Sequence, residues 1–461
     1  MIGLGLLSIW AAATPPAGPS SMSDKLSTGD TAWMLTASAL VLLMTPGLSF
    51  FYGGMVRGKN VLSTMLQSYM AMGVVSLLWV VVGFSLAFGD SIGGVIGDPR
   101  TFLMMRGVDG DPSPALCPTV PLALFAIFQM KFAIITPALI TGSFAERVRF
   151  SSYIWFIGLF TVLIYCPLAH MTWHPDGLLH KLGVLDFAGG TVVHMSAGFA
   201  ALAAALVLGP RRDHQKGLQH RPAHIPFVML GTGMLWFGWF GFNAGSALAA
   251  NSVAVHAFLT TNTASAAAMV AWLLLDGIRG GRATAMGACI GAVVGLVAIT
   301  PAAGYVSTGS SIFIGAFASL VSNFAVHWKS RTAFDDTLDV FPCHGVGGMV
   351  GMILTGLLAD KTVNAGGDNG WFHGNPALFT HHILALVGVA IGVTLGSWLI
   401  FKAIDAVSPL RVTEAQEAEG LDLSQHGESM LEGDPRATHP AAPHAHAPLT
   451  SPALAPELSA S

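Results

Sequence analysis

The chain is divided into long stretches that contain no Asp, Glu, Lys or Arg. Two of them, 222–275 and 283–328, are long enough for two helices each, and 120–143 is interrupted only by Lys131. The remaining stretches suit one helix each and cover 31–56, 60–89, 150–175, 187–210, 340–359 and 369–401. A membrane-spanning helix needs about 20 apolar residues. The pattern therefore predicts eleven transmembrane helices, and the odd number places the two termini on opposite sides of the membrane.

The composition agrees with an all-α integral membrane protein. Charged residues make up 10% of the chain and hydrophobic residues 53%, with a mean hydropathy of +0.63. So few charges could not cover the surface of a water-soluble protein, which excludes a soluble enzyme and a disordered chain. The net charge of −4 gives no reason to expect nucleic acid. The four cysteines are scattered and have no CxxC spacing, so neither a disulfide framework nor a metal site is expected.

The loops differ in their basic residues, which predicts the orientation. One set of connections holds fourteen: Arg57, Lys59, Arg147, Arg149, Arg211, Arg212, Lys216, Arg221, Arg279, Arg282, Lys329, Arg331, Lys402 and Arg411. The alternate set holds five: Lys25, Arg100, Arg106, Lys181 and Lys361. The richer set is expected in the cytoplasm, so the N-terminus lies outside and the C-terminus inside.

Four segments follow from this pattern. Residues 1–30 form an extracytoplasmic segment, in which Met1–Ala13 resembles a weak signal peptide without a basic start, so cleavage is left open. Residues 31–406 are the transmembrane domain, and 407–434 are a polar, acidic, cytoplasmic regulatory region. Residues 435–461 are a Pro/Ala/His/Ser tail expected to be disordered. Three tail histidines could bind a metal, but a biased linker is the favoured reading: His439, His444 and His446.

Two segments place polar groups at membrane depth, Asp186–Gly198 and Asp336–Gly348. Each begins with a carboxylate near one membrane face and carries a histidine further along. Eight helical residues from Asp186 to His194 rise about 12 Å, and nine from Asp335 to His344 rise about 13.5 Å. In a core about 30 Å thick, both histidines lie near the midplane.

The two segments enter from opposite faces, as helix 5 and helix 10 of the predicted set. Helices 1–5 and 6–10 therefore form two inverted halves, followed by helix 11. Transporters with inverted repeats bind substrate at the repeat interface near the midplane. Two unrelated core histidines, each bonded to a carbonyl, are the alternative. Matched positions in inverted halves favour function. The neighbouring glycines indicate close helix packing: Gly189, Gly190, Gly345, Gly347 and Gly348.

Several segments make the resemblance specific: FYGGMVRGKNVLS (51–63), FQMKFAIITPALITGSFAERVRF (128–150), DFAGGTVVHMSAG (186–198), GWFGFNAGSA (238–247), DDTLDVFPCHGVGG (335–348) and LRVTEAQEAEGLDLSQHGE (410–428). Together they resemble the ammonium transporter family (Amt/Mep/Rh), Amt branch, from about residue 30 to 430. The resemblance implies a homotrimer in which every protomer has its own narrow hydrophobic pore. It also implies a bacterial inner-membrane location and a cytoplasmic PII-type signalling partner. No cofactor is implied.

The resemblance assigns roles residue by residue. His194 and His344 are the paired pore histidines, which relay protons and conduct ammonia. An imidazole suits this task because its unperturbed pKa is about 6.5 and it donates at one nitrogen while accepting at the other. Trp173, Phe132 and Ser246 match the outer ammonium recruitment site, where aromatic faces attract a cation. An interfacial aromatic belt would be the alternative for Trp173 alone.

Further residues border these positions. Tyr165 matches a residue beside the recruitment site. Phe132 and Phe242 correspond to the paired rings that gate the pore, whereas Trp239 is expected to serve packing. Asp186 gives structural and electrostatic support, compatible with an N-cap for the helix from Phe187 onward.

Three charged residues lie outside this core set. Asp336 and Asp339 are expected to cap helix 10 or to tune the cytoplasmic exit. Lys131 does not fit, because a lysine in mid-span is costly. It is adjacent to Phe132, about 100° around the helix, and therefore outside the pore. A protomer interface or a carboxylate partner is open for it.

The predicted function is passive, selective transport of ammonium. NH4+ is attracted and desolvated outside, loses its proton, and crosses as ammonia, with the proton following through the histidines or not. A Rhesus-type neutral NH3/CO2 channel is one alternative, although Trp173 and Ser246 argue against it. An ammonium sensor that acts through its tail is another. An enzyme is not expected, because neither paired carboxylates nor a nucleophile–base pair lies at membrane depth. No GxxxxGK[ST] motif suggests ATP drive.

Overall fold

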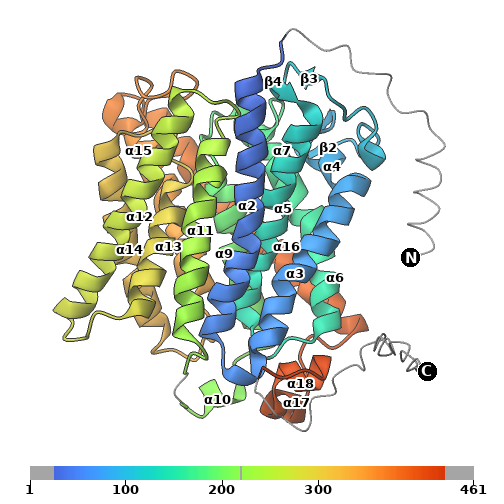
Figure 1. Ribbon diagram of the computed structural model, residues 1–461, viewed down its shortest axis with the longest axis vertical. Helices are drawn as coiled ribbons and strands as arrows, with labels where there is room; N and C mark the ends of the chain where they lie inside the picture. Colours follow the sequence, from blue (N-terminus) through green and yellow to red (C-terminus); the bar gives the residue numbers. More distant parts are fainter. Residues whose placement is uncertain (1–24, 219–220, 431–461) are drawn as a thin grey trace, which may run out of the picture.

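The computed structural model describes residues 25–218 and 221–430 as a bundle of long helices (Figure 1). Within these residues, ten helical stretches are long and apolar enough to cross a membrane. They are Thr28–Met55, Gly58–Phe88, Leu122–Phe144, Phe150–Lys181, Gly190–Leu208, Ile225–Gly245, Ser252–Ile278, Thr308–Lys329, Phe341–Leu358 and Pro376–Val407. A shorter apolar helix, α13 (Ala285–Ile299), lies among them. The chain is therefore a helical membrane protein, and helices coincide with most of the length of every charge-free stretch of the sequence.

Several of these stretches are single helices from end to end: α2 (Thr28–Met55), α5 (Leu122–Phe144), α11 (Ile225–Gly245), α12 (Ser252–Ile278), α14 (Thr308–Lys329) and α16 (Pro376–Val407). Others contain a π-helical turn. The stretch Gly58–Phe88 consists of η1 (Gly58–Asn60), α3 (Val61–Leu78), the π-helical turn η2 (Trp79–Gly83) and α4 (Phe84–Phe88). The stretch that begins at Phe150 contains α6 (Phe150–Phe160), the π-helical turn η4 (Thr161–Tyr165) and α7 (Cys166–Trp173). Such turns insert a residue into the helix and often mark functional sites.

The two stretches that carry His194 and His344 have the same construction. In both cases a π-helical turn precedes an α-helix: η5 (Gly190–Met195) with α9 (Ser196–Leu208), and η6 (Phe341–Val346) with α15 (Gly347–Leu358). The two stretches cross closely, since a Cβ at Gly198 would overlap the backbone of Gly345. A Cβ at Gly348 would lie 3.2 Å from the Cβ of His194. Small residues at this crossing bring the two histidine-bearing turns together.

Short elements occupy the two ends of the bundle. At the upper end in Figure 1, β1 pairs with β2 and β3 pairs with β4, both antiparallel. The short elements are β1 (Ser91–Ile92), β2 (Ile96–Gly97), η3 (Leu103–Met105), β3 (Pro112–Ser113), β4 (Cys117–Pro121), α8 (Leu178–Lys181), α10 (Arg212–Gln215), η7 (Trp371–His373), α17 (Glu414–Glu419) and α18 (Leu421–His426). The hydrophobic pattern did not predict the hairpins, because their strands are too short to show alternation.

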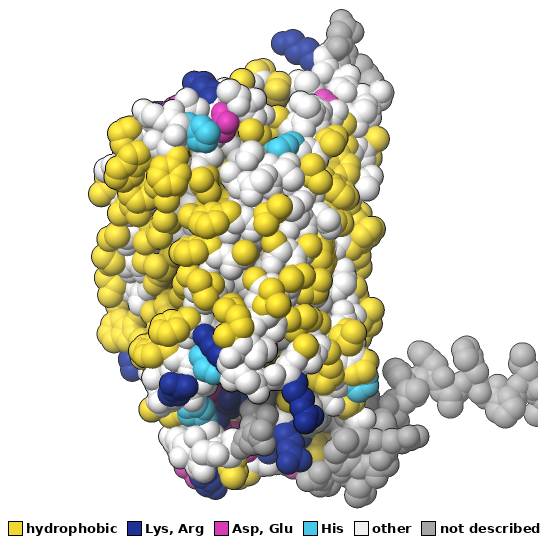
Figure 2. Space-filling view, turned by 90° about the vertical axis from the view of Figure 1, so that its left-hand side faces the viewer, with side chains coloured by type: hydrophobic (Ala, Val, Ile, Leu, Met, Phe, Trp, Pro, Cys, Tyr) yellow, Lys and Arg dark blue, Asp and Glu magenta, His cyan; other side chains and the backbone are white. Residues whose placement is uncertain are grey.

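The surface has the polarity of a membrane protein. Figure 2 shows hydrophobic side chains over the middle of the visible face, and charged side chains gathered at its two ends. Large apolar side chains are exposed on several helices, among them Leu77 (62%), Trp155 (65%) and Phe313 (51%). Exposed apolar area on this scale requires a lipid or protein cover.

A network of buried charges ties the loops together at the lower end. The Glu146 carboxylate accepts hydrogen bonds from Arg57 (2.6 Å) and from Arg211 (2.8 Å). Arg211 also binds Asp335 at 2.8 Å. Burial by itself would raise the pKa of Asp335. The hydrogen bonds from Arg211 and the charge of Arg147 have the larger combined effect and hold this pKa below its usual range. Asp335 is therefore ionised and paired with Arg211.

The acidic region after the last long helix folds against the same end of the bundle (Figure 1). The Asp422 carboxylate accepts hydrogen bonds from the backbone N–H groups of Leu62 (3.1 Å) and Ser63 (2.8 Å), at the start of α3. The Leu421 N–H donates to the Asn60 side chain at 2.8 Å. The described part of the expected regulatory region, which ends at Met430, is therefore folded against the bundle. The expected signal-peptide segment and the 435–461 tail lie outside the described residues.

Candidate functional site

The two predicted pore histidines meet in the interior of the bundle. The Nδ1 atoms of His194 and His344 are 3.4 Å apart, and the two side chains are 1% and 4% exposed. Each histidine lies in a π-helical turn, η5 or η6, which widens the helix locally and changes the direction of the side chain. The pair is therefore a preorganised, hydrogen-bonded unit.

Asp186 sets the position of His194 by starting η5. Its carboxylate accepts hydrogen bonds from the N–H groups of Gly189 (2.8 Å), Gly190 (2.6 Å) and Thr191 (2.8 Å), and from the Thr191 hydroxyl (2.5 Å). The sequence pattern predicted a helix that begins at Phe187, but the helix begins at Gly190. The cause is Gly189, whose φ of 123° is not helical. Both carboxylate oxygens of Asp186 therefore accept hydrogen bonds from residues at the start of η5.

Asp336 has the same relation to His344. It precedes that histidine by eight residues, and its Oδ2 accepts the N–H of Phe341 at 2.7 Å, at the start of η6. The distance predicted from the sequence was counted from Asp335, but the Asp335 side chain binds Arg211. Asp339 instead pairs with Lys329 at 2.6 Å. Carboxylates therefore start both histidine-bearing turns.

The three residues expected at the outer recruitment site line one cavity of about 130 Å³. Phe132 meets Trp173 edge-on, with ring centroids 5.8 Å apart. The Ser246 hydroxyl donates to the Phe242 carbonyl at 2.8 Å, which leaves its lone pairs free to accept. The lining comprises Phe88, Ala115, Leu116, Phe125, Gln129, Phe132, Trp173, Phe187, Ser246 and Leu248. Trp173 and Ser246 also line a larger cavity of about 540 Å³ toward the loops.

Two phenylalanines separate this cavity from the histidines. The rings of Phe132 and Phe242 are 4.2 Å apart and tilted by 36°, and both side chains are buried. The Phe242 ring is 5.9 Å from the His194 ring. Cavity, ring pair and histidine pair thus follow one another in a continuous series.

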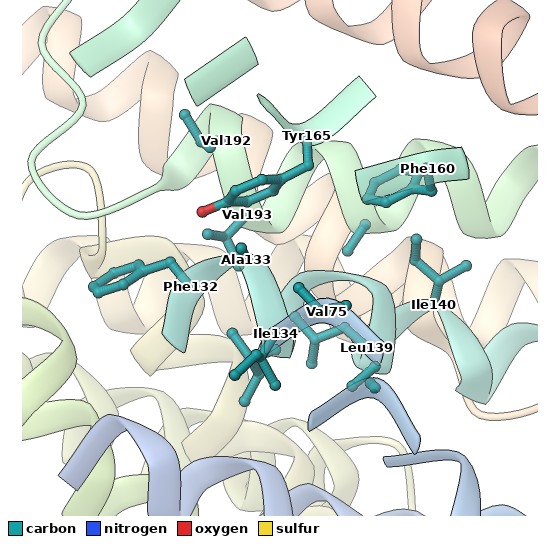
Figure 3. Close-up of a cluster of buried hydrophobic side chains, with 14 of the residues drawn as sticks. Val75, Phe132, Ala133, Ile134, Leu139, Ile140, Phe160, Tyr165, Val192 and Val193 are labelled. Atoms are coloured by element: carbon teal, nitrogen blue, oxygen red, sulfur yellow. The ribbon is translucent and has the colours of Figure 1, made fainter. Parts of the chain in front are cut away.

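Tyr165 lies beside this series, outside the residues that line either cavity. It is fully buried, and its ring is 6.5 Å from that of Trp79. Figure 3 shows its hydroxyl directed toward the Val193 and Phe132 side of a hydrophobic cluster. Among the described residues, this hydroxyl has no hydrogen-bond partner.

Two residues of the site were not predicted from the sequence. Trp239, expected only to pack, stacks on His194 with centroids 5.3 Å apart and planes at 21°. Its indole N–H donates to the Thr300 hydroxyl at 2.9 Å. Thr300 immediately precedes Pro301 at the end of α13. This helix end is the one sequence feature that could have pointed to Thr300 as a site residue.

Lys131, which is adjacent to Phe132 in sequence, faces away from the two outer cavities. Its side chain is half-buried, and the neighbouring Ile127 on the same helix face is 41% exposed. The Lys131 ammonium contacts the Met130 sulfur at 3.9 Å. Lys131 is absent from the lining of both outer cavities.

Comparison with known proteins decides the family. A family profile described as "Ammonium Transporter Family" matches residues 32–431. The chain belongs to the ammonium transporter family. The resemblance found in the sequence motifs is thereby confirmed, and the protein is a multi-pass membrane transporter.

Individual relatives of this transporter agree. An ammonium transporter from Aquifex aeolicus is 47% identical over 406 residues, which cover 88% of this chain and 93% of that relative. The crystal structure of Candida albicans Mep2 superposes with a TM-score of 0.81 at 36% identity, covering 85% of this chain and 88% of that one. A structure described as a sensor Amt protein gives a TM-score of 0.78 at 31% identity, covering 86% and 98%.

Proposed function

We propose that this transporter selectively conducts ammonium through the series of cavity, ring pair and histidine pair. The observation that carries the proposal is the double role of Phe132. Its ring lines the outer cavity with Trp173 and Ser246, and it also packs at 4.2 Å on Phe242, next to His194. A cation held in the cavity is therefore already at the ring pair.

Recruitment rests on aromatic faces and one hydroxyl. Trp173 and Phe132 attract NH4+ by roughly 1–2 kcal/mol when the cation is partly desolvated. The Ser246 hydroxyl accepts an N–H of the ion. The bond from Trp173 Nε1 to the Asp186 carbonyl (3.1 Å) holds the indole in place and links this site to the start of η5. Tyr165 supports Phe132 from the side.

The ring pair provides selectivity. A dry aromatic constriction opposes a hydrated ion, because the ion must lose its water shell. Ammonium can pass its proton to another group and continue as neutral ammonia. Potassium has no proton to lose and is rejected. This difference makes deprotonation the selective step.

The histidine pair conducts ammonia and relays protons. Neutral imidazoles donate and accept hydrogen bonds, so they replace part of the hydration that ammonia loses. The hydrogen-bonded Nδ1 atoms of His194 and His344 provide a path for the proton. Transport is electrogenic if the proton follows the ammonia.

The proposed topology has eleven spans in two inverted five-helix halves plus α16, with the N-terminus outside. The ten long apolar helices together with α13 in the described chain support this count. The equivalent starts of η5 and η6, by Asp186 and Asp336, support the repeat. The basic residues of the predicted cytoplasmic loops support the orientation. Asp339, paired with Lys329, lies at the proposed cytoplasmic exit.

The proposed assembly is a homotrimer in a bacterial inner membrane, with a PII-type protein as its cytoplasmic partner. Exposed apolar side chains on α12 and α14, such as Phe258 (41%) and Phe313 (51%), support burial against another protomer. The folded α17–α18 region, at the end of the bundle that carries α10, offers a surface for the cytoplasmic partner.

Uptake into proteoliposomes tests the proposal. Ammonium and potassium entry would be followed with lumenal pH- and potassium-sensitive dyes for wild type, His194→Ala and His344→Ala. The exposed His327 on α14 supplies a matched control, His327→Ala. We expect ammonium-selective entry in wild type and the control, and altered selectivity or flux in both pore variants. Unchanged behaviour of both pore variants would refute the proposed path.

Sensing is a second candidate, favoured by the likeness to the sensor Amt protein. A deletion of residues 411–461 separates the two functions. Loss of a downstream response with preserved transport would favour sensing. A neutral Rhesus-type channel predicts rates that depend on NH3 alone at any NH4+ concentration.

A further inference from the structure

The Thr300 hydroxyl contacts both His194 and Trp239, the two stacked rings at the centre of the site. It is fully buried at the C-cap of α13. Its Oγ1 lies 2.8 Å from the Leu296 carbonyl oxygen, 2.9 Å from Trp239 Nε1 and 3.3 Å from His194 Nε2. Three polar groups thus meet at one hydroxyl.

The end of α13 explains why the hydroxyl turns toward Leu296. The Thr300 N–H bonds to the Val297 carbonyl at 3.2 Å and not to Leu296 four residues back. Pro301 follows and has no N–H. The Leu296 carbonyl therefore takes the Thr300 hydroxyl proton as its donor.

The number of protons and lone pairs at the Thr300 hydroxyl then determines the tautomer of His194. A hydroxyl has one proton and two lone pairs. The proton goes to Leu296, and an indole nitrogen can only donate, so Trp239 occupies one lone pair. The second lone pair faces His194 Nε2, which must therefore carry a proton. A neutral imidazole carries one proton, so Nδ1 of His194 is bare.

We propose that Thr300 is a positioning residue that fixes the tautomers of the histidine pair at rest. Since Nδ1 of His194 is bare, it accepts from Nδ1–H of His344 across 3.4 Å. The only bare nitrogen left is Nε2 of His344. This inference rests on the proposed function for its meaning in transport, although the tautomer itself can be observed without transport.

The assignment gives the relay a defined entry. A proton accepted at Nε2 of His344 makes that ring an imidazolium. The imidazolium can pass its Nδ1 proton to the bare Nδ1 of His194, which leaves His344 neutral and His194 charged. His344 is therefore the proton acceptor of the resting pair. Because His194 lies between His344 and the Phe242 ring, the resting pair is set to pass a proton toward the outer cavity, and inward transfer requires both histidines to change tautomer.

Solid-state ¹⁵N NMR of the full-length, histidine-labelled protein in lipid bilayers tests the assignment. Signals of His194 and His344 are identified by their loss in His194→Ala and His344→Ala. We expect protonated Nε2 and bare Nδ1 for His194, and the reverse for His344. Wild type alone decides this point, because the opposite pattern would overturn the proposal even if no Thr300 variant folded.

Variants test whether Thr300 is the cause. Thr300→Val removes the acceptor and should shift the tautomer ratio of His194 by roughly tenfold, the effect of about one net hydrogen bond. Thr300→Ser retains the hydroxyl and the wild-type pattern. Thr355→Val is the matched control, since Thr355 is a buried threonine whose hydroxyl likewise bonds four residues back, to Gly351 at 2.8 Å. An unchanged ratio in Thr300→Val overturns the proposal.

Ammonium-evoked current on the same preparations separates this inference from the proposed function. We expect the current of Thr300→Val to differ from that of wild type by roughly tenfold, with Thr300→Ser and Thr355→Val near wild type. A shifted tautomer with unchanged current would overturn the role of Thr300 in the relay. Absence of ammonium transport in wild type would overturn the proposed function, while the tautomers would still report on Thr300.

Discussion

The Nδ1 atoms of His194 and His344 lie 3.4 Å apart, although 150 residues separate the two histidines in sequence. Each is the end point of the same local construction, a carboxylate that starts a π-helical turn with the histidine inside it. Their proximity depends on the glycines at the helix crossing and on the two carboxylates. These features give the following predictions.

The ring pair is expected to keep water and potassium out. Phe242→Ala removes a ring that lies 4.2 Å from Phe132 and opens a path between the outer cavity and His194. We predict that potassium entry into proteoliposomes rises, with ammonium selectivity reduced by at least about tenfold, because ions then need not lose their whole water shell. Leu399→Ala, at a position of α16 that is 59% exposed, is the control and should leave selectivity unchanged. Equal selectivity in both variants would contradict the gate.

The helix crossing should not tolerate a methyl group. Gly198→Ala places a Cβ against the backbone of Gly345, which cannot move without displacing His344. The expected loss is about 1–3 kcal/mol of unfolding free energy, or failure to fold. Gly388→Ala on α16, where a Cβ meets nothing within 4 Å, should be neutral or slightly stabilising. Thermal unfolding in detergent compares the two, and similar midpoints would disprove the close crossing.

Asp186 should matter for stability more than its single charge suggests. Asp186→Ala leaves three buried N–H groups and one hydroxyl without their acceptor, with an expected cost of at least about 3 kcal/mol. Asp186→Asn retains one acceptor oxygen and should be intermediate. Asp176 forms an exposed ion pair with Lys181, so Asp176→Asn is a control of small effect. Chemical denaturation gives the order, and an Asp186→Ala protein as stable as the control would be incompatible with this role.

Docking of the C-terminal region should depend on pH through Asp422. Burial raises the pKa of its carboxyl to about 6, although hydrogen bonds from Ser63 and Leu62 oppose the shift. Because the folded pKa is raised, the contribution of Asp422 is complete below about pH 4 and is lost as pH rises to about 6. Asp422→Asn stays neutral and should lose no protection in this range.

Amide hydrogen exchange of residues 414–426, corrected for intrinsic rates, measures this difference. Burial lowers the pKa of His426 and acts in the opposite direction, but His426 is present in both proteins. The quantity to compare is the protection factor of Asp422→Asn divided by that of wild type. We expect this ratio to be roughly tenfold larger at pH 6.5 than at pH 4.5. A ratio that does not change with pH would speak against a raised Asp422 pKa.

The sequence predicted the long helices well because charge is excluded from the membrane interior, so each span appears as a charge-free stretch. It also predicted the meeting of Phe132, Trp173 and Ser246, through motif resemblance. The π-helical turns could not be predicted from the sequence, because widening a helix by one residue leaves its hydrophobic pattern unchanged. Asp335 and Asp336 are adjacent in sequence, and only the position of Arg211 shows which of them starts η6.

Two further features depend on distant contacts. Trp239 could be assigned to packing from its motif, but its hydrogen bond to Thr300 joins two helices that sequence alone does not bring together. Thr300 itself looks like an ordinary residue at a helix end. Its importance comes from the three groups that meet at its hydroxyl.

Ammonium-evoked current in proteoliposomes, with potassium as the control and His194→Ala beside wild type, tests the central claim most directly. The account predicts current with ammonium and none with potassium in wild type, and loss of this selectivity in His194→Ala. A wild-type protein that conducts potassium as readily as ammonium would contradict it, as would a His194→Ala protein that retains the selective current.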